Sequence, residues 1–192
     1  MSKQRIEPGP YLVPMPIVLV GAMVDGKPNF MTAAFCTIVN TRPPTIVCGL
    51  NPEHRTCRGM EENGCFSINL PELDQVEVTD YCGIHSGNEV DKSQLFQTFT
   101  GELPAPMIEE CAVTAECRLV HGHPLAIDTV YVGEIVSVHA EERVLTDGAL
   151  DWQKLRPLLF TFPDGAYRRL GERLAKAWDV GKGHRPRGSQ RS

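Results

Sequence analysis

No stretch of this 192-residue sequence is apolar for long enough to cross a bilayer as a helix. The longest apolar run covers residues 17–24, whereas a spanning helix needs about 20 consecutive apolar residues. Residues 1–16 (MSKQRIEPGPYLVPMP) contain prolines and a glycine where a secretory signal has an uninterrupted apolar segment. The sequence therefore predicts neither a transmembrane helix nor a secretory signal, and we expect a cytoplasmic protein with no membrane partner.

Basic residues are outnumbered by acidic ones, with 19 Lys and Arg against 24 Asp and Glu. The formal net charge is −5, and a nucleic-acid-binding domain needs a basic face. Residues 182–192 (KGHRPRGSQRS) combine basic residues with glycine, proline and serine, which is typical of a flexible tail. We expect residues 1–181 to form a single domain, residues 182–192 to form a flexible basic tail, and no nucleic acid to bind.

The seven cysteines lack the close spacing of a zinc site. Four of them lie in the apolar runs TAAFCTIV, TIVCGL, GCFSINL and VTAECRLV, where a thiol packs as a small hydrophobic group. Cys82 stands beside a glycine in an expected loop and is the thiol that we single out for possible reactivity. The sequence contains no HExxH, GxGxxG or Walker loop and no Ser-His-Asp order. Hydrolase, zinc-enzyme and dinucleotide-fold functions therefore have no support.

The sequence does contain short β-branched runs separated by turn dipeptides. Asp-Gly occurs at 25–26, 147–148 and 164–165, and such a pair between two runs predicts a hairpin, because a type I′ turn needs positive φ at both central residues. The predicted strands are 17–24, 29–39, 45–50, 65–70, 113–121 and 129–145. Their number indicates a mainly β, antiparallel protein with a closed or half-closed barrel, which hides its sheet edges.

A few helices are predicted beside these strands. They cover residues 53–63, 71–81 and 166–178. The first has Asn51 as its N-cap, a proline at its first position and Gly64 as its stop. The third rests on apolar residues that recur at helical spacing. Residues 83–92 are a polar loop.

The passage from the strand at 45–50 into the first helix (LNPEHRT) is the first candidate site. A helix N-terminus presents unpaired N–H groups and a partial positive charge, which suit a phosphate group. Arg55 adds a bidentate donor and Thr56 adds a hydroxyl. An ordinary capped helix with a surface arginine explains the same residues, so this motif alone does not distinguish a phosphate site from a simple helix start.

Two further segments are candidates. In residues 29–35 (NFMTAAF) small side chains interrupt a bulky strand, which lets a flat ligand approach the backbone, although close packing against a helix makes the same demand. In residues 82–92 (CGIHSGNEVDK) two glycines permit a tight loop, and Lys92 offers a charge for an anion beside Asp91. A solvated connection is the alternative there.

Six segments in order carry a resemblance that none carries alone. They are GKPNFMTAAF, TRPPTIVCGL leading into NPEHRT, NGCFSINLP, CGIHSGNEVDK, VYVGEIVSV and PDGAYRRLGERLAKAW, and they cover most of residues 14–178. In this order they resemble the flavin-reductase-like family of FMN-binding split barrels. The resemblance implies an antiparallel, Greek-key split β-barrel with a few flanking helices, FMN as cofactor, and a homodimer in which each flavin lies near the subunit boundary.

The resemblance also implies roles for individual residues. The isoalloxazine ring would be lined by Asn29, Met31, Thr32, Ala33, Ala34 and Phe35. The phosphate and ribityl chain would be held by Arg55, Thr56 and Lys92, with Ser86 and Asp91 in the loop beside them. Phe162 to Tyr167 would close the pocket.

Two departures from the family pattern bear on function. Phe35 stands where some relatives carry tryptophan, and AIDT at 126–129 replaces a Gly-Asp-His run whose histidine lies near the nicotinamide in related reductases. His121 and His123 are nearby candidates to substitute for it, and a surface histidine at the end of a strand is the alternative for each. Two functions follow. One is an NAD(P)H-dependent reductase of flavin, ferric chelates or a small organic acceptor, and the other is an FMN electron carrier reduced by a partner protein.

Overall fold

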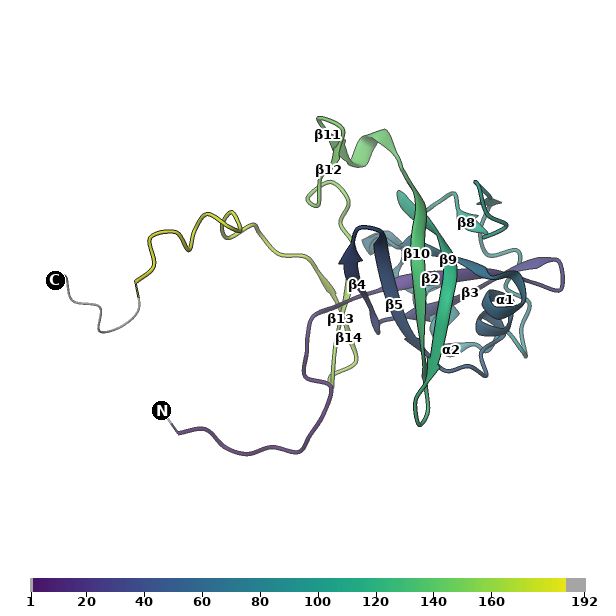
Figure 1. Cartoon of the computed structure of the whole chain (residues 1–192), viewed down its shortest axis with the longest axis horizontal. Helices are drawn as coiled ribbons and strands as arrows, with labels where there is room; N and C mark the ends of the chain where they lie inside the picture. Colours follow the sequence, from purple (N-terminus) through teal and green to yellow (C-terminus); the bar gives the residue numbers. More distant parts are fainter. Residues whose placement is uncertain (1, 186–192) are drawn as a thin grey trace.

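The protein, described here by a computed structural model of residues 2–185, is built on a seven-stranded antiparallel sheet (Figure 1). The strand order is β3-β2-β6-β9-β10-β5-β4. The bounds are β2 (Val18–Val24), β3 (Lys27–Ala33), β4 (Cys36–Thr41), β5 (Pro44–Leu50), β6 (Cys65–Leu70), β9 (Val113–Pro124) and β10 (Thr129–Ala140). Short strands β7 (Thr98–Phe99) and β8 (Met107–Ile108) form a separate ladder.

The sheet curls into a half-closed barrel, as expected. Strands β3 and β4 are the two edges of the sheet, yet β3 ends at Ala33 and β4 begins at Cys36. A connection of only two residues can join opposite edges only if the sheet curls until they approach each other. The β3 and β4 backbones do not pair, so the barrel stays split between them. The predicted strand 29–39 is therefore wrong as one element, because the chain bends at Ala34 and Phe35.

The first hairpin is confirmed and follows from local chemistry. Asp25 and Gly26 have φ values of +51° and +75°, as a type I′ turn requires. This turn sets the register of β2 against β3, from Val24 opposite Lys27 to Val18 opposite Ala33. The hairpin thereby places the side chains of β3 beside the first helix.

The barrel interior is filled by large apolar side chains from several strands and from helix α1 (Arg55–Asn63). Phe66, Met60 and Tyr131 are almost fully buried there, and burying such a side chain contributes roughly 1.5–3 kcal/mol. Glycines allow close approach at two points. A Cβ on Gly133 would lie 2.4 Å from the ring of Phe66, and one on Gly59 would lie 2.4 Å from a β2 carbonyl.

Both internal helices begin later than predicted. Helix α1 starts at Arg55 because Asn51 accepts a hydrogen bond from the Glu53 N–H (3.0 Å), which makes a turn rather than a helix cap. Its end at Gly64, with φ +64°, is as predicted. A short 3₁₀ turn, η1 (Leu73–Gln75), precedes α2 (Val76–Ile84). Cys82 therefore lies in a helix, where burial raises its pKa to about 11, and not in a reactive loop.

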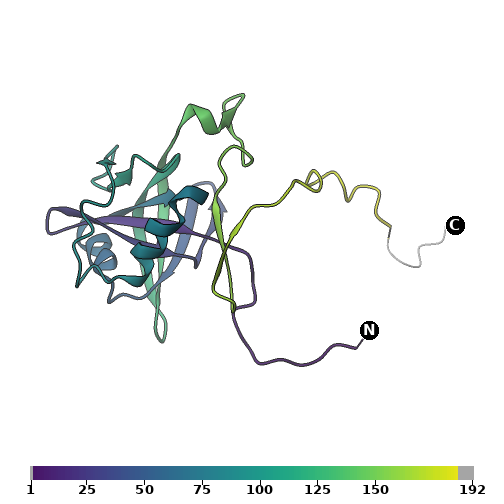
Figure 2. The ribbon, with the colours of Figure 1, turned by 180° about the vertical axis from the view of Figure 1, so that it is seen from behind.

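The predicted helix 166–178 is wrong. Residues Ala166–Arg169 form strand β14, which pairs with β13 (Leu158–Thr161), and β13 pairs with β1 (Met15–Pro16). The Asp-Gly turn at 164–165 builds a hairpin and so takes these residues into a sheet. The chain that follows leaves the barrel on the same side as the N-terminal arm (Figure 2). In this position residues 174–178 have no protein surface beside them on which a helix could bury its apolar stripe, so the predicted helix lacks the packing that would stabilise it.

The predicted strand 129–145 is too long. Strand β10 ends at Ala140, and the 3₁₀ turn η2 (Glu142–Val144) leads into a small hairpin of β11 (Leu145–Thr146) and β12 (Ala149–Leu150). The Asp-Gly pair at 147–148 forms its turn, with φ +51° and +76°. Within residues 2–185 no helix has the length and apolar character needed to span a membrane.

Candidate functional site

Two adjoining pockets lie between β3, the start of α1 and the loop that follows α2. The inner pocket has a volume of about 150 Å³ and the outer pocket about 370 Å³. Both are lined by Asn29, Arg55 and Gly87, which form the neck between them. The inner pocket is further lined by Met31, Thr32, His54, Thr56, Cys82, Gly83, Ile84, His85, Ser86 and Lys92. The three segments selected from the sequence therefore meet here.

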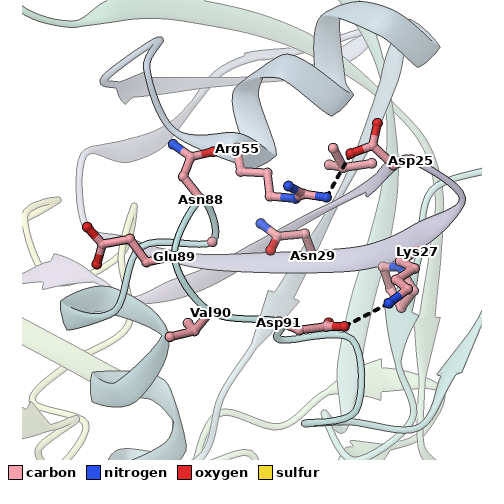
Figure 3. Close-up of a pocket in the computed structure, with 11 residues that line it drawn as sticks. Asp25, Lys27, Asn29, Arg55, Asn88, Glu89, Val90 and Asp91 are labelled. Atoms are coloured by element: carbon pink, nitrogen blue, oxygen red, sulfur yellow. Dashed lines mark hydrogen bonds and ion pairs between the residues drawn. The ribbon is translucent and has the colours of Figure 1, made fainter.

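Arg55 stands at the first position of α1 and points across the neck (Figure 3). Its Nη2 lies 2.8 Å from Oδ2 of Asp25, and Arg58 donates to the same oxygen at 2.6 Å. Two guanidinium groups thus share the carboxylate of Asp25, and Arg58 also pairs with Glu62 at 3.5 Å, so the charges of these four side chains balance. The unpaired N–H groups at the start of α1 give this end of the site its positive character.

Asn29 and Thr56 connect the strand to the helix at the bottom of the neck. The Asn29 Nδ2 donates to the Thr56 Oγ1 at 2.8 Å, and both residues are buried. Since the Thr56 oxygen accepts this bond, its own hydroxyl hydrogen stays available to a ligand. Gly87 packs directly against Asn29, because a Cβ there would lie 2.6 Å from the Asn29 Oδ1. The loop can approach the strand only with glycine at this position.

Lys92 is a buried cation in the wall of the inner pocket. It is only 2% exposed, and its ammonium group donates to the carbonyls of Phe30 (3.1 Å) and Cys82 (2.8 Å). Burial lowers its pKa. No carboxylate in residues 2–185 forms an ion pair with it, and an ammonium group has three donors. Because a buried charge is costly without a partner, this wall suits an anionic ligand.

The loop after α2 is held by its own polar contacts. Ser86 lines the inner pocket, and its Oγ accepts from the Asn88 N–H at 3.2 Å. Asn88 in turn donates to the Glu53 carbonyl at 3.1 Å. Asp91 instead faces the outer pocket, where it pairs with Lys27 at 2.8 Å (Figure 3). The hydrogen bond from Lys27 keeps the pKa of Asp91 well below its usual value.

The residues expected to line a flavin ring lie in three different places: the inner pocket, the barrel core and a separate apolar pocket. Met31 and Thr32 line the inner pocket, and the Thr32 hydroxyl donates to the carbonyl of Thr79 in α2. Ala33 points into the barrel core. Ala34 and Phe35 line a separate apolar pocket, formed with the N-terminal arm. The bend between β3 and β4 causes this separation.

Phe162 and Tyr167 do not line the inner pocket. Tyr167 lies on β14, and its hydroxyl donates to Asp80 of α2 at 2.9 Å. Asp80 lies one helical turn before Ile84, which lines the inner pocket. Strand β14 therefore contacts helix α2 close to the inner pocket but does not line the pocket itself. His121 and His123 lie at the far end of β9 and line neither pocket. The closing role of Phe162 and Tyr167 stays a prediction.

Several pocket-lining residues were not selected from the sequence. His54 lies directly before Arg55, and burial together with the nearby charge of Lys92 lowers its pKa. His85 stacks on Tyr81, with ring centroids 4.2 Å apart. Both histidines were inside the quoted segments, but only the fold shows that they face the pocket. The described part of the chain holds no group of His, Cys, Asp or Glu residues arranged to bind a metal ion.

Comparisons with known sequences and with solved structures point to the same family of proteins. The sequence model of the flavin reductase like domain matches residues 11–171. A flavoredoxin structure from Methanosarcina acetivorans is 43% identical, with a TM-score of 0.92 over 95% of this chain and 98% of that one. The flavoredoxin of Desulfovibrio vulgaris (Miyazaki F) is 34% identical, with a TM-score of 0.88 over 94% and 100%. An FMN-binding protein from Thermus thermophilus, solved with p-hydroxybenzaldehyde, is 27% identical, with a TM-score of 0.77 over 92% and 98%.

Proposed function

The chain belongs to the flavin reductase-like family, and from this premise we propose that it binds FMN and transfers reducing equivalents through it. The bound flavin would supply the hydride or electron chemistry, and the protein would bind and orient it. The observation that carries the proposal is the buried Lys92, which has no carboxylate partner in residues 2–185 and lines the same pocket as Arg55 and the start of α1.

The inner pocket suits the phosphate end of FMN. It offers a buried ammonium group, a guanidinium group, the Thr56 hydroxyl and the N–H groups of a helix start, all of which are phosphate donors. Its volume of about 150 Å³ is smaller than the roughly 300–1,000 Å³ of a whole ligand site. The phosphate and part of the ribityl chain would therefore occupy it, and the ring would extend beyond it.

We place the ring past Met31 and Thr32, toward the bend at Ala34 and Phe35. The apolar pocket at this bend has a volume of about 370 Å³ and is also lined by the N-terminal arm. Phe35 is half exposed there, so its ring is available to stack on a flat partner. This arrangement leaves one side of the flavin open to a second molecule.

A homodimer completes the proposal. Residues 170–185 lead away from the barrel, with turns over residues 177–183, and they carry Leu174 and Trp178, which are 98% and 95% exposed. Side chains of this size are costly to leave in water. We propose that a second copy of the chain covers these arms and borders the open side of the flavin. The seven free thiols agree with the reducing cytoplasm that we expect.

The proposed flavin site is compatible with two kinds of electron donor, a nicotinamide nucleotide or another protein. In the first case the protein is a reductase that takes hydride from NADH or NADPH. In the second it is a carrier that keeps FMN and accepts electrons from another protein. The position of His121 and His123 outside both pockets favours the carrier. His54 and His85 line the inner pocket, where we place the phosphate, and therefore favour neither case.

Anaerobic reduction distinguishes the two cases. The FMN-loaded protein is mixed with NADH, then with NADPH, and the flavin absorbance is followed. Loss of the yellow colour within seconds identifies the reductase and its donor. Colour that persists with both nucleotides and disappears with dithionite identifies the carrier. A chain that takes up no FMN would contradict both.

A further inference from the structure

Cys36 and Cys48 lie directly opposite each other on the neighbouring strands β4 and β5. The Gly49 N–H donates to the Phe35 carbonyl at 2.8 Å, so this hydrogen bond joins the residue after Cys48 to the residue before Cys36. In an antiparallel ladder that pattern marks a non-hydrogen-bonded pair, the type whose Cα atoms are closest, about 4.5 Å apart. A disulfide spans Cα separations of about 4.4–6.8 Å.

The two side chains also meet on the same face of the sheet. Both belong to the barrel core and are almost fully buried. The pKa of Cys48 lies well above its usual value because of its hydrogen bond to Cys36 and its burial. The two sulfur atoms are therefore neighbours in the folded protein and need no rearrangement of strands to meet.

Cys36 has a route to the outside that its neighbours in the core lack. It lines the apolar pocket at the β3–β4 bend together with Leu12 and Met15 of the N-terminal arm. Cys57 and Cys117 belong to the same core cluster but are fully buried and do not line this pocket. A small uncharged molecule in the pocket would reach Cys36 first, with Cys48 behind it.

We propose that Cys36 and Cys48 are a reversible dithiol–disulfide couple oxidised by small hydroperoxides. The Cys36 sulfur attacks the outer peroxide oxygen, the O–O bond breaks, and the leaving oxygen takes the Cys36 proton to form an alcohol. The Cys48 sulfur then attacks the Cys36 sulfenic acid, the S–O bond breaks, and the hydroxyl leaves with the Cys48 proton as water. Two thiols lose two electrons and two protons, and one hydroperoxide is reduced. This site goes beyond the proposed flavin function. It shares the apolar pocket in which we place the flavin ring, so bound FMN should slow the oxidation of Cys36 but is not needed for it.

The sequence provides a clean assay. Lys27 and Arg42 both precede proline, where trypsin does not cut, so one tryptic peptide, 6–55, carries Cys36 and Cys48 and no other cysteine. Peptides 59–92 and 93–118 each carry two other cysteines and serve as internal controls. The folded protein is treated with tert-butyl hydroperoxide, unfolded in the presence of N-ethylmaleimide and digested with trypsin. The peptide masses are then measured by mass spectrometry. We expect peptide 6–55 to lose two hydrogens and take no maleimide, while each control peptide takes two.

Variants test the order of the reaction. In Cys48→Ala we expect Cys36 to stay as a sulfenic acid that dimedone traps, and in Cys36→Ala we expect Cys48 to stay reduced. Cys117→Ala, in the same core, should form the disulfide at the parental rate, and dithiothreitol should restore both thiols. The parent protein alone can overturn the proposal. It is wrong if peptide 6–55 keeps two maleimides after oxidation, or if the control peptides lose theirs equally fast.

Discussion

Replacing Lys92 with methionine removes the ammonium group but keeps most of the side-chain volume. A charge-assisted hydrogen bond to phosphate in a partly shielded site contributes about 1.5–3 kcal/mol, which corresponds to a roughly 10- to 150-fold weaker affinity for FMN. The Phe30 and Cys82 carbonyls also lose a donor in this variant. The apo-protein should therefore lose about 1–3 kcal/mol of stability as well.

The assay separates the two effects by comparing FMN with riboflavin, which lacks the phosphate. Dissociation constants are measured for both flavins by quenching of flavin fluorescence. Lys92→Met should lower the preference for FMN over riboflavin by the factor above and leave riboflavin affinity nearly unchanged. Lys154 is the control, since its ammonium group also donates to a backbone carbonyl, that of Leu145 in the β11–β12 hairpin, but lines neither pocket. The reasoning is refuted if Lys92→Met keeps the preference for FMN, or if Lys154→Met lowers it equally.

Four further outcomes follow from the structure. Gly133→Ala places a Cβ 2.4 Å from the ring of Phe66 and should cost about 1–3 kcal/mol of unfolding free energy; an unchanged denaturation midpoint would contradict this packing. Ala33→Val fills a core position and should lower the thermal midpoint equally with and without FMN, whereas a loss seen only with FMN would place the ring on Ala33. Burial opposes ionisation of Glu116, but the hydrogen bonds that its carboxylate accepts outweigh this and lower its pKa. The stability that ionised Glu116 contributes is therefore present above the unfolded pKa near 4.5 and is lost as the pH falls through the lower folded pKa. Glu116→Gln should flatten the acid limb of a stability–pH curve, and an unchanged limb would mean that other groups cause the acid limb. Sedimentation of the FMN-loaded protein should show a dimer at micromolar concentration that Trp178→Ala weakens, and a fully loaded monomer would exclude the proposed interface.

The strands were predictable where local chemistry decides them. The tight turn at 25–26 requires positive φ at both central residues, which Asp-Gly tolerates, and the register of β2 against β3 follows. A second Asp-Gly pair, at 164–165, also lies between paired strands, although only Gly165 has positive φ there. The apolar spacing after this pair favoured a helix in our interpretation. The periodic residues Leu174 and Trp178 are almost fully exposed in the described part of the chain. Periodicity alone therefore could not tell a buried helix face from an exposed arm.

The candidate site was predictable in its segments but not in its geometry. Arg55, Thr56 and Lys92 do meet at one pocket, as the resemblance implied. The burial of Lys92 depends on carbonyls of Phe30 and Cys82, which come from two other elements. The separation of Ala34 from that pocket depends on a bend at the sheet edge. Such features arise from tertiary packing, and no local pattern encodes them.

The most direct test of the account is the amount of flavin that the apo-protein binds. Equilibrium dialysis against FMN and against riboflavin gives the stoichiometry and affinity for each. We predict saturation at one FMN per chain, with riboflavin bound at least about tenfold more weakly, because the pocket walls supply the phosphate donors. Equal binding of both flavins would remove the phosphate role of the inner pocket, and no uptake of FMN would contradict the proposed function as a whole.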